Sequence, residues 1–162
     1  MSKLRCDVIG VGYLGRFHAQ KYKLLSNAEL VGVCDLNIDT CNTVATELDV
    51  AAYNNYHGLI GKVDAVSIAA TTSAHYSIAK DFLAKGVHCL IEKPITRTYQ
   101  EAQELISIAQ ESGAKLQVGH LERFNEARMA LDPHLDKPLY VDSQRLAPFN
   151  PRGTDVNVIL DL

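Results

Sequence analysis

The stretch CDVIGVGYLG, residues 6–15, decides the fold of this chain. An apolar run leads into Gly10, Gly12 and Gly15, which have the spacing G-x-G-x-x-G. This spacing predicts a strand that ends near Gly10, a tight turn, and a helix whose first N–H groups face outward. Gly10 permits the turn, Gly12 leaves room for a phosphate, and Gly15 lets the helix approach the strand. The stretch therefore predicts a site for the pyrophosphate of a dinucleotide.

An acidic residue, Asp35, follows the second expected strand at residues 29–34. Dinucleotide-binding chains carry an acid about 20 residues after the glycines, where it accepts hydrogen bonds from the ribose hydroxyls. A carboxylate would repel a 2′-phosphate, so NAD is expected rather than NADP. Asp35 can also serve as a turn residue, and the two roles are compatible. Tyr13 and Leu14, between the glycines, are expected to border the cofactor as well.

The composition indicates a folded domain with a hydrophobic core. The chain has 162 residues, 47% of them hydrophobic, and a formal net charge of −3, which supports a globular fold and does not favour a nucleic-acid partner. Cys6, Cys34, Cys41 and Cys89 lack metal-ligand spacing, so buried free thiols, no metal and a reducing cytoplasm are expected. No apolar run resembles a membrane span or a signal peptide, so no membrane partner is expected.

Strands and helices are expected to alternate along the first 120 residues. Apolar runs predict strands, and periodic apolar positions between them predict helices. The expected strands are residues 6–10, 29–34, 50–53, 65–69, 87–91 and 116–118. Because parallel strands joined by helices cross over with one hand, this order predicts an α/β fold with a doubly wound parallel sheet.

Several helix ends carry local signals. Asn37 or Asp39 is expected to cap the second helix. Thr98 and Glu101 form a capping-box pattern at the start of a later helix, which Gly113 is expected to stop.

The first helix carries the apolar residues Leu14, Phe17, Leu24 and Leu25. These residues are expected to share one helical face.

Glu92, Lys93 and Pro94 follow the fifth expected strand directly. Open α/β sheets bind ligands outside the carboxyl ends of their strands. Lys93 is therefore expected to contact a ligand there, against the alternative of an ordinary surface lysine.

The alternation changes after Gly119. Residues 122–131 look helical, and Leu139–Leu146 is expected to be a strand. We therefore expect a dinucleotide-binding domain at residues 1–120 and the beginning of a second domain at residues 121–162. About forty residues are too few for an independent domain of ordinary size, so this part is expected either to pack on the first domain or to be the incomplete beginning of a second one.

Together these motifs resemble the Gfo/Idh/MocA oxidoreductases, the glucose–fructose oxidoreductase and inositol dehydrogenase group. The resemblance rests on the glycine stretch, Asp35, the Glu-Lys-Pro element at 92–94 and the stretch GHLERFN at 119–125. The Glu-Lys-Pro element is the most specific part, because many unrelated dehydrogenases share the glycines. The resemblance implies a Rossmann NAD-binding domain followed by an α/β C-terminal domain, here truncated.

Within the family, residues 119–125 and 145–155 look most like UDP-N-acetylglucosamine 3-dehydrogenases. The resemblance implies a sugar or nucleotide sugar as the small-molecule substrate, oxidised at C3 with NAD as hydride acceptor. It also implies a homo-oligomer where the second domain is complete.

The resemblance assigns roles to single residues. Lys93 would be catalytic, contacting the nicotinamide ribose and the substrate hydroxyl, with a cis peptide bond before Pro94. Glu92, Thr71 and His75 are expected beside the cofactor, although His75 can equally be a plain residue at the start of a helix.

Three further residues are assigned to the substrate side. His120 and Arg123 are expected to line the substrate cleft, or to act as interdomain hydrogen-bond partners. The family completes its site with an aspartate followed four residues later by a histidine, and Asp161 matches that catalytic aspartate. Because the sequence stops at Leu162, we expect a partial enzyme, with a non-catalytic NAD-binding module as the alternative.

Overall fold

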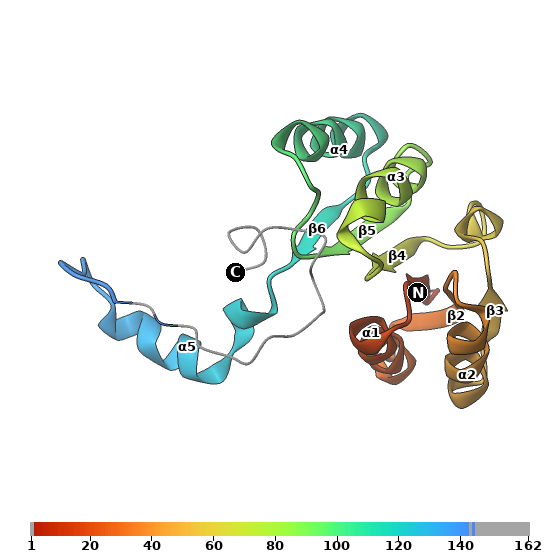
Figure 1. Cartoon of the computed structure of the whole chain (residues 1–162), viewed down its shortest axis with the longest axis horizontal. Helices are drawn as coiled ribbons and strands as arrows, with labels where there is room; N and C mark the ends of the chain where they lie inside the picture. Colours follow the sequence, from red (N-terminus) through yellow and green to blue (C-terminus); the bar gives the residue numbers. More distant parts are fainter. Residues whose placement is uncertain (1, 143, 145–162) are drawn as a thin grey trace.

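The computed structural model describes residues 2–142 and 144. Six parallel strands form one sheet in the order β3-β2-β1-β4-β5-β6 (Figure 1). The strands are β1 (Leu4–Ile9), β2 (Ala28–Cys34), β3 (Ala51–Tyr53), β4 (Ala65–Ile68), β5 (His88–Glu92) and β6 (Leu116–Gly119). The helices are α1 (Tyr13–Leu24), α2 (Ile38–Leu48), α3 (Thr72–Leu83), α4 (Tyr99–Ser112) and α5 (Glu126–Leu131), with short 3-10 helices η1 (Tyr56–Leu59), η2 (Leu121–Phe124) and η3 (Asp132–His134). The expected doubly wound α/β sheet is confirmed.

Helices cover both faces of the sheet (Figure 1). The core under α1 and α2 is built from small and β-branched residues, including Val8, Ala19 and Val44. The core under α3 and α4 is larger and includes Phe82 and Leu105, both fully buried. Burial of such a side chain stabilises the fold by about 1.5–3 kcal/mol, so the two cores hold the sheet rigid from both sides.

The strand order reverses between β1 and β4. Strand β1 pairs with β2 on one side and β4 on the other, so that Ile9 lies beside both Cys34 and Ile68. The pairing continues past the strand ends, because Gly10 donates its N–H to Cys34 O at 2.8 Å and Ala69 donates to Ile9 O at 2.8 Å. The loops that follow β1, β2 and β4 therefore emerge together at the edge where such sheets bind ligands.

Three of the expected helix ends are confirmed. The Asn37 side chain, and not that of Asp39, caps α2 by accepting hydrogen bonds from two main-chain N–H groups. Thr98 and Glu101 form the reciprocal capping box of α4. Gly113 ends that helix at φ 73°, in the left-handed region that glycine favours.

The apolar residues expected on one face of α1 are mostly not buried. Phe17, Leu24 and Leu25 are exposed by 48%, 77% and 48%, whereas the buried residues of α1 are Gly15 and Ala19. The close approach of α1 at Gly15 leaves room only for a small residue there, whereas further along the helix His18 and Tyr22 reach Ser67 of β4. Phe17 and Leu24 lie on the outer side.

Asp7 is buried in β1 opposite Gly32 of β2. Within the described part of the chain, neither of its carboxyl oxygens has a hydrogen-bond partner. Burial raises the pKa of Asp7 to about 8, and the neighbouring Val8 N–H opposes this rise without cancelling it. A Cβ at position 32 would lie 2.9 Å from the carboxyl group, so glycine there provides the space that Asp7 occupies.

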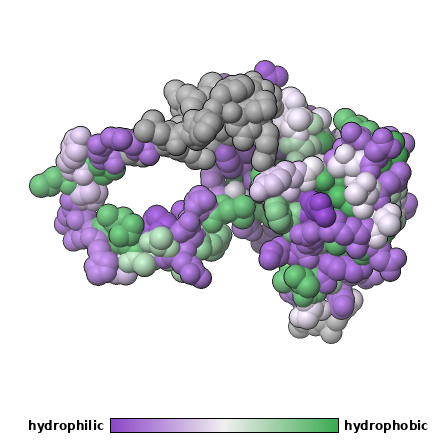
Figure 2. Space-filling view, turned by 60° about the horizontal axis from the view of Figure 1, so that its bottom comes forward, coloured by the Kyte–Doolittle hydropathy of each residue, from purple (hydrophilic) through white to green (hydrophobic). Residues whose placement is uncertain are grey.

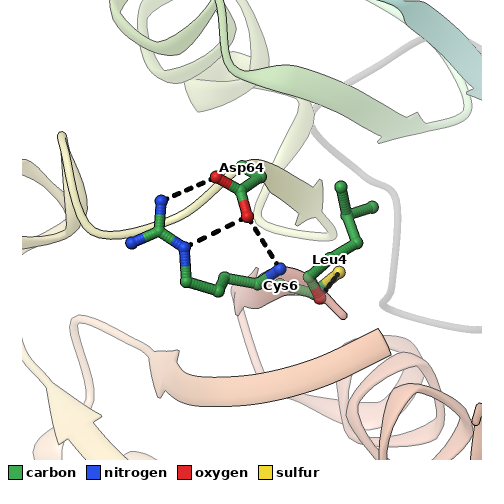
Figure 3. Close-up of polar contacts among 4 residues, drawn as sticks. Leu4, Cys6 and Asp64 are labelled. Atoms are coloured by element: carbon green, nitrogen blue, oxygen red, sulfur yellow. Dashed lines mark hydrogen bonds and ion pairs between the residues drawn. The ribbon is translucent and has the colours of Figure 1, made fainter. Parts of the chain in front are cut away.

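An ion pair joins the start of β1 to the residue before β4, and Figure 3 shows the Asp64 carboxyl group within this set of polar contacts. Arg5 Nη2 lies 2.6 Å from Asp64 Oδ1, and Nε and the main-chain N of Arg5 donate to Oδ2. The Arg5 guanidinium lowers the pKa of Asp64 to about 2. The two side chains are 46% and 37% exposed, so water screens the pair and its contribution to stability is small.

Beyond β6 the chain leaves the sheet. Helices η2, α5 and η3 lie on an arm that extends away from it, and every described residue from His120 to Asp142 is exposed (Figure 1). The helix expected over residues 122–131 is present in two pieces, because Asn125 ends η2 and its side chain caps α5. Figure 2 shows apolar side chains among hydrophilic ones along this arm.

The strand expected at Leu139–Leu146 is not found in its first four residues, 139–142. Of the rest of that segment, residues 143, 145 and 146 lie outside the described part of the chain.

Candidate functional site

The glycine turn has the geometry that its spacing predicts. Gly10 has φ +85°, and a Cβ there would lie 2.5 Å from Ala70 N. A Cβ on Gly15 would lie 1.8 Å from Gly10 O, so α1 is in contact with the turn. Two of the three glycines are therefore required by close main-chain packing.

Gly12 differs from the other two glycines because the space beside it is open. A Cβ at this position would meet no described atom within 4 Å. Gly12 is also the N-cap of α1 and has no side chain with which to cap the first N–H groups of the helix. These N–H groups and the positive end of the helix dipole favour an anion at this place.

Asp35 stands half-buried at the end of β2, beside the glycine turn. Its Oδ2 accepts the N–H of Val11 at 2.8 Å, and its Oδ1 accepts the N–H of Asn37 at 2.8 Å. The second contact forms a turn and the first joins the carboxylate to the glycine stretch, so both of the roles that the sequence allows are structurally compatible. Because a carboxylate offers about four acceptor positions, Asp35 retains the capacity to bind ribose hydroxyls.

These features fit the two halves of a dinucleotide. The open space beside Gly12 lies where a pyrophosphate would meet the helix N-terminus. The residues after Asp35 are Leu36, exposed by 93%, and Asn37. Neither could pair with a 2′-phosphate as an arginine does, so the donor set fits NAD.

Lys93 follows β5 at the same edge of the sheet. Strand β5 pairs with β4 in register, and β4 pairs with β1, so a single strand separates Lys93 from the glycine turn. Its side chain is half-buried, and the peptide bond between Lys93 and Pro94 is cis, as the resemblance implies. This placement is compatible with a ligand contact by Lys93, which stays a prediction.

Glu92, the last residue of β5, is buried. Its Oε1 lies 3.0 Å from Nε2 of His18, in an ion-pair contact, and its Oε2 accepts the N–H of Lys93 at 3.3 Å. Burial raises the pKa of Glu92, but the His18 imidazole, the Lys93 N–H and the charge of His75 outweigh it, so that the pKa lies below its usual value. The buried carboxyl group is thus held in its ionised form.

His75, on α3, contacts the other side of the Glu-Lys-Pro element. Its ring is 1% exposed, with Nδ1 2.9 Å from Pro94 O and Nε2 3.0 Å from Ala70 O. Ala70 belongs to the loop after β4 that packs on Gly10. His75 therefore connects the Lys93 segment to the glycine turn, and a direct contact with the cofactor stays a prediction.

The remaining predicted residues are placed at the rim or on the arm. Tyr13 is exposed by 65% and Leu14 is half-buried at the start of α1, and Thr71 is the exposed N-cap of α3. His120 and Arg123 are exposed on and beside η2, next to the end of β6. Asp161 lies outside the described residues.

Residues 2–142 and 144 contain no cluster of three or more His, Cys, Asp or Glu side chains able to hold a metal ion. All four cysteines are buried free thiols, as expected. None of the helices in the described ranges combines the length and apolar character needed to cross a bilayer.

Comparison with known proteins identifies the family. Residues 4–120 match the Gfo/Idh/MocA model, described as an oxidoreductase family with an NAD-binding Rossmann fold. The chain belongs to the Gfo/Idh/MocA oxidoreductases. Its membership confirms NAD as the cofactor of the domain and an oxidoreductase as the class of protein.

Similar proteins include sugar-nucleotide and cyclitol dehydrogenases. The chain is 46% identical to a UDP-N-acetylglucosamine 3-dehydrogenase of Acidithiobacillus ferrooxidans over all of its own length and 51% of that relative. A solved structure of that enzyme has a TM-score of 0.88 at 45% identity, matching 99% of this chain and 53% of the other. A scyllo-inositol 2-dehydrogenase (NAD(+)) of Bacillus subtilis is 31% identical, over 85% of this chain and 43% of its own.

One further structure has the cofactor bound. GenD2 from gentamicin A biosynthesis, in complex with NAD, has a TM-score of 0.71 at 26% identity over 74% of this chain and 35% of its own. This Gfo/Idh/MocA chain spans about half the length of the curated relatives it matches.

Sequence reasoning missed His18, Ser67 and Gly119 as members of the site. His18 contacts Glu92 and Ser67, and a Cβ on Gly119 would lie 2.7 Å from Glu92 Oε1. These contacts join separate elements, and no local pattern relates the residues. Two signals were available: the isolated polar residue Ser67 within an apolar strand, and Gly119 as the first residue of the stretch GHLERFN.

Proposed function

We propose that this chain forms the NAD-binding half of the active site of a dehydrogenase that oxidises UDP-N-acetylglucosamine at C3. The observation on which the proposal rests is the position of Lys93 at the carboxyl edge of the sheet, separated by a single strand from the glycine turn. The similarity to the Acidithiobacillus ferrooxidans enzyme over the whole chain supports the choice of substrate.

Different residues of the chain bind the cofactor and orient the substrate. The turn from Gly10 to Gly15 binds the pyrophosphate, and Asp35 binds the ribose. NAD, when bound, supplies the hydride acceptor. The Lys93 ammonium orients the substrate hydroxyl and stabilises the negative charge that develops on its oxygen as the proton leaves.

The substrate side is part of the same proposal. His120 and Arg123 border the sugar nucleotide, and Asp161 serves as the catalytic carboxylate. The division into a dinucleotide-binding domain at residues 1–120 and a second domain from residue 121 is supported by the arm, whose exposed residues, such as Phe124 at 71%, offer a surface for further packing. A homo-oligomer through that second domain belongs to the proposal as well.

Two measurements test the proposal. Titration calorimetry of the chain with NAD and with NADP should show binding of NAD and weaker binding of NADP. Turnover is measured as NADH formation in a chimera that joins this chain to the C-terminal half of the 46%-identical relative, with UDP-N-acetylglucosamine, UDP-glucose and myo-inositol as substrates.

The chimera should oxidise UDP-N-acetylglucosamine, and Lys93→Met should abolish turnover while leaving NAD binding in place. Turnover of myo-inositol without turnover of either UDP-sugar would contradict the proposal that UDP-N-acetylglucosamine is the substrate. Binding of NAD without turnover of any of the three substrates would favour a non-catalytic NAD-binding module.

A further inference from the structure

We infer that His18 is a positioning residue for Lys93, acting through Glu92. The inference rests on the proposed function, because it concerns the orientation of the lysine expected to contact substrate. His18 belongs to a buried network that links α1 to Ser67 and Glu92. The glycine turn and the Glu-Lys-Pro element do not by themselves account for this network.

His18 on α1 contacts Glu92 at the end of β5. Nε2 of His18 lies 3.0 Å from Oε1 of Glu92, and the two side chains are exposed by 11% and 6%. Within the described residues Oε1 has no hydrogen-bond partner of good geometry, so the imidazole holds the carboxyl group by close charge contact rather than by an aligned hydrogen bond. The pair is shielded from water, which makes the loss of either partner costly for the other.

Ser67 of β4 orients the His18 ring. Nδ1 of His18 lies 3.2 Å from Oγ of Ser67, which in turn lies 2.7 Å from the hydroxyl of Tyr22. The direction of the bond between Nδ1 and Ser67 depends on the ring tautomer, and either hydroxyl can donate between Ser67 and Tyr22. The ring is thus fixed from α1 and from β4 at the same time.

Glu92 in turn contacts the main chain of Lys93. Oε2 of Glu92 accepts the main-chain N–H of Lys93 at 3.3 Å. On the far side of the carboxyl group, Gly119 of β6 lacks a side chain, and a Cβ there would come within 2.7 Å of Oε1. Glu92 therefore fills a close-fitting site, and its second oxygen holds the main chain from which Lys93 projects.

Among the residues that the structure describes, the charged and titratable groups shown around this pair come from three elements. They are His18 and Tyr22 on α1, Glu92 and Lys93 at the end of β5, and His75 on α3. Since His75 also contacts Pro94 O, two histidines hold the segment on either side of Lys93. Removal of His18 would leave the Glu92 carboxylate without its buried partner and free to turn away from Lys93.

The test is the main-chain amide signal of Lys93 in nitrogen–proton NMR spectra of the chain. His18→Leu and Glu92→Gln should each shift this signal in the same direction, because each weakens the same hydrogen bond. The double variant should show no further shift. His18→Gln, which keeps an N–H group near Glu92, should restore the signal towards its original position and covers the case in which His18→Leu does not fold.

His57→Leu is the matched control. Nε2 of His57 also faces a carboxylate, with Oδ2 of Asp81 at 3.4 Å, but His57 lies on η1 and not on α1. It should leave the Lys93 signal unchanged. In the chimera, His18→Leu should lower kcat about 10- to 100-fold with little change in KM for NAD.

An unchanged Lys93 signal in His18→Leu, or additive shifts in the double variant, would overturn the inference. NAD titration of the same samples tests the proposed function separately. Failure of the unaltered chain to bind NAD would count against that function, whereas NAD binding with an unresponsive Lys93 signal would count against the positioning role alone.

Discussion

The main-chain N–H of Val11 donates a 2.8 Å hydrogen bond to Oδ2 of Asp35. This bond joins the loop after β1 to the residue that follows β2, so the parts of the chain predicted to bind the pyrophosphate and the ribose are fixed relative to each other. Asp35 therefore serves the geometry of the turn as well as the expected contact with the cofactor.

Asp35→Ala should weaken NAD binding about 10- to 100-fold, because a hydrogen bond to a charged group contributes about 1.5–3 kcal/mol. Titration calorimetry below the melting temperature gives the Kd. Asp64→Ala is the control, since Asp64 pairs with Arg5 at the opposite edge of the sheet. Equal NAD affinity in Asp35→Ala and the unaltered chain would contradict the prediction.

Gly12→Ala should lower NAD affinity with little change in stability, whereas Gly15→Ala should lower the stability of the fold. Gly12→Ala adds a methyl group to open space, so the free energy of unfolding should change by less than about 1 kcal/mol while NAD affinity falls. Gly15→Ala places a methyl group 1.8 Å from Gly10 O and should destabilise the fold by more than about 2 kcal/mol. Urea unfolding and calorimetry separate the two outcomes, and a stable Gly15→Ala would refute the close packing of α1.

The free energy of unfolding of the unaltered chain should fall as pH rises, and Asp7→Asn should abolish this fall. The pKa of Asp7 is about 8 in the folded chain, above its usual 3.8, so the folded state holds its proton more tightly than the unfolded state. Its contribution to stability is complete below the usual pKa and is lost as pH rises through the folded value. In the unaltered chain the free energy of unfolding should fall between about pH 4 and pH 8, by about 1.4 kcal/mol for each unit of pKa shift realised.

The Asp7→Asn variant should lack this fall, which urea unfolding across that pH range measures. Asp64→Asn is a control of opposite sign, because Arg5 lowers the pKa of Asp64 to about 2 and its stabilisation is lost as pH falls. Parallel stability curves for the unaltered chain and Asp7→Asn would show that Asp7 does not titrate in this way.

The cysteine thiols should be unreactive in the folded chain. Burial raises the pKa of Cys6 to about 11 and those of Cys34 and Cys89 to about 12, and it raises that of Cys41 as well. Since the thiolate is the reactive form, a disulfide reagent at pH 8 should modify the thiols only at the rate of unfolding. All four should react at once in urea, and rapid labelling of any thiol in buffer would contradict their burial.

The parts of the fold that depend on local chemistry were predictable. Gly113 and the pair Thr98 and Glu101 marked helix ends because capping uses residues within one turn. The buried face of α1 was not predictable from apolar residues, since the close approach at Gly15 excludes large side chains such as Phe17.

The site was predictable where a motif has fixed spacing and unpredictable where separate strands meet. The glycines, Asp35 and Lys93 follow strand ends, so the parallel topology alone places them at one edge. The contact of His18 with Glu92 depends on the rotation of α1 against the sheet, which the packing of both faces determines. The burial of Asp7 depends on Gly32 in a neighbouring strand.

Gly119 has a consequence for how this sequence can change over evolutionary time. Its missing side chain leaves the space that the Glu92 carboxyl group occupies, so the two positions are sterically dependent on each other. A relative that acquires a side chain at position 119 must shorten or redirect the residue at position 92, and with it the acceptor of the Lys93 N–H. Substitutions on the edge strand β6 are therefore expected to covary with the residue before the lysine.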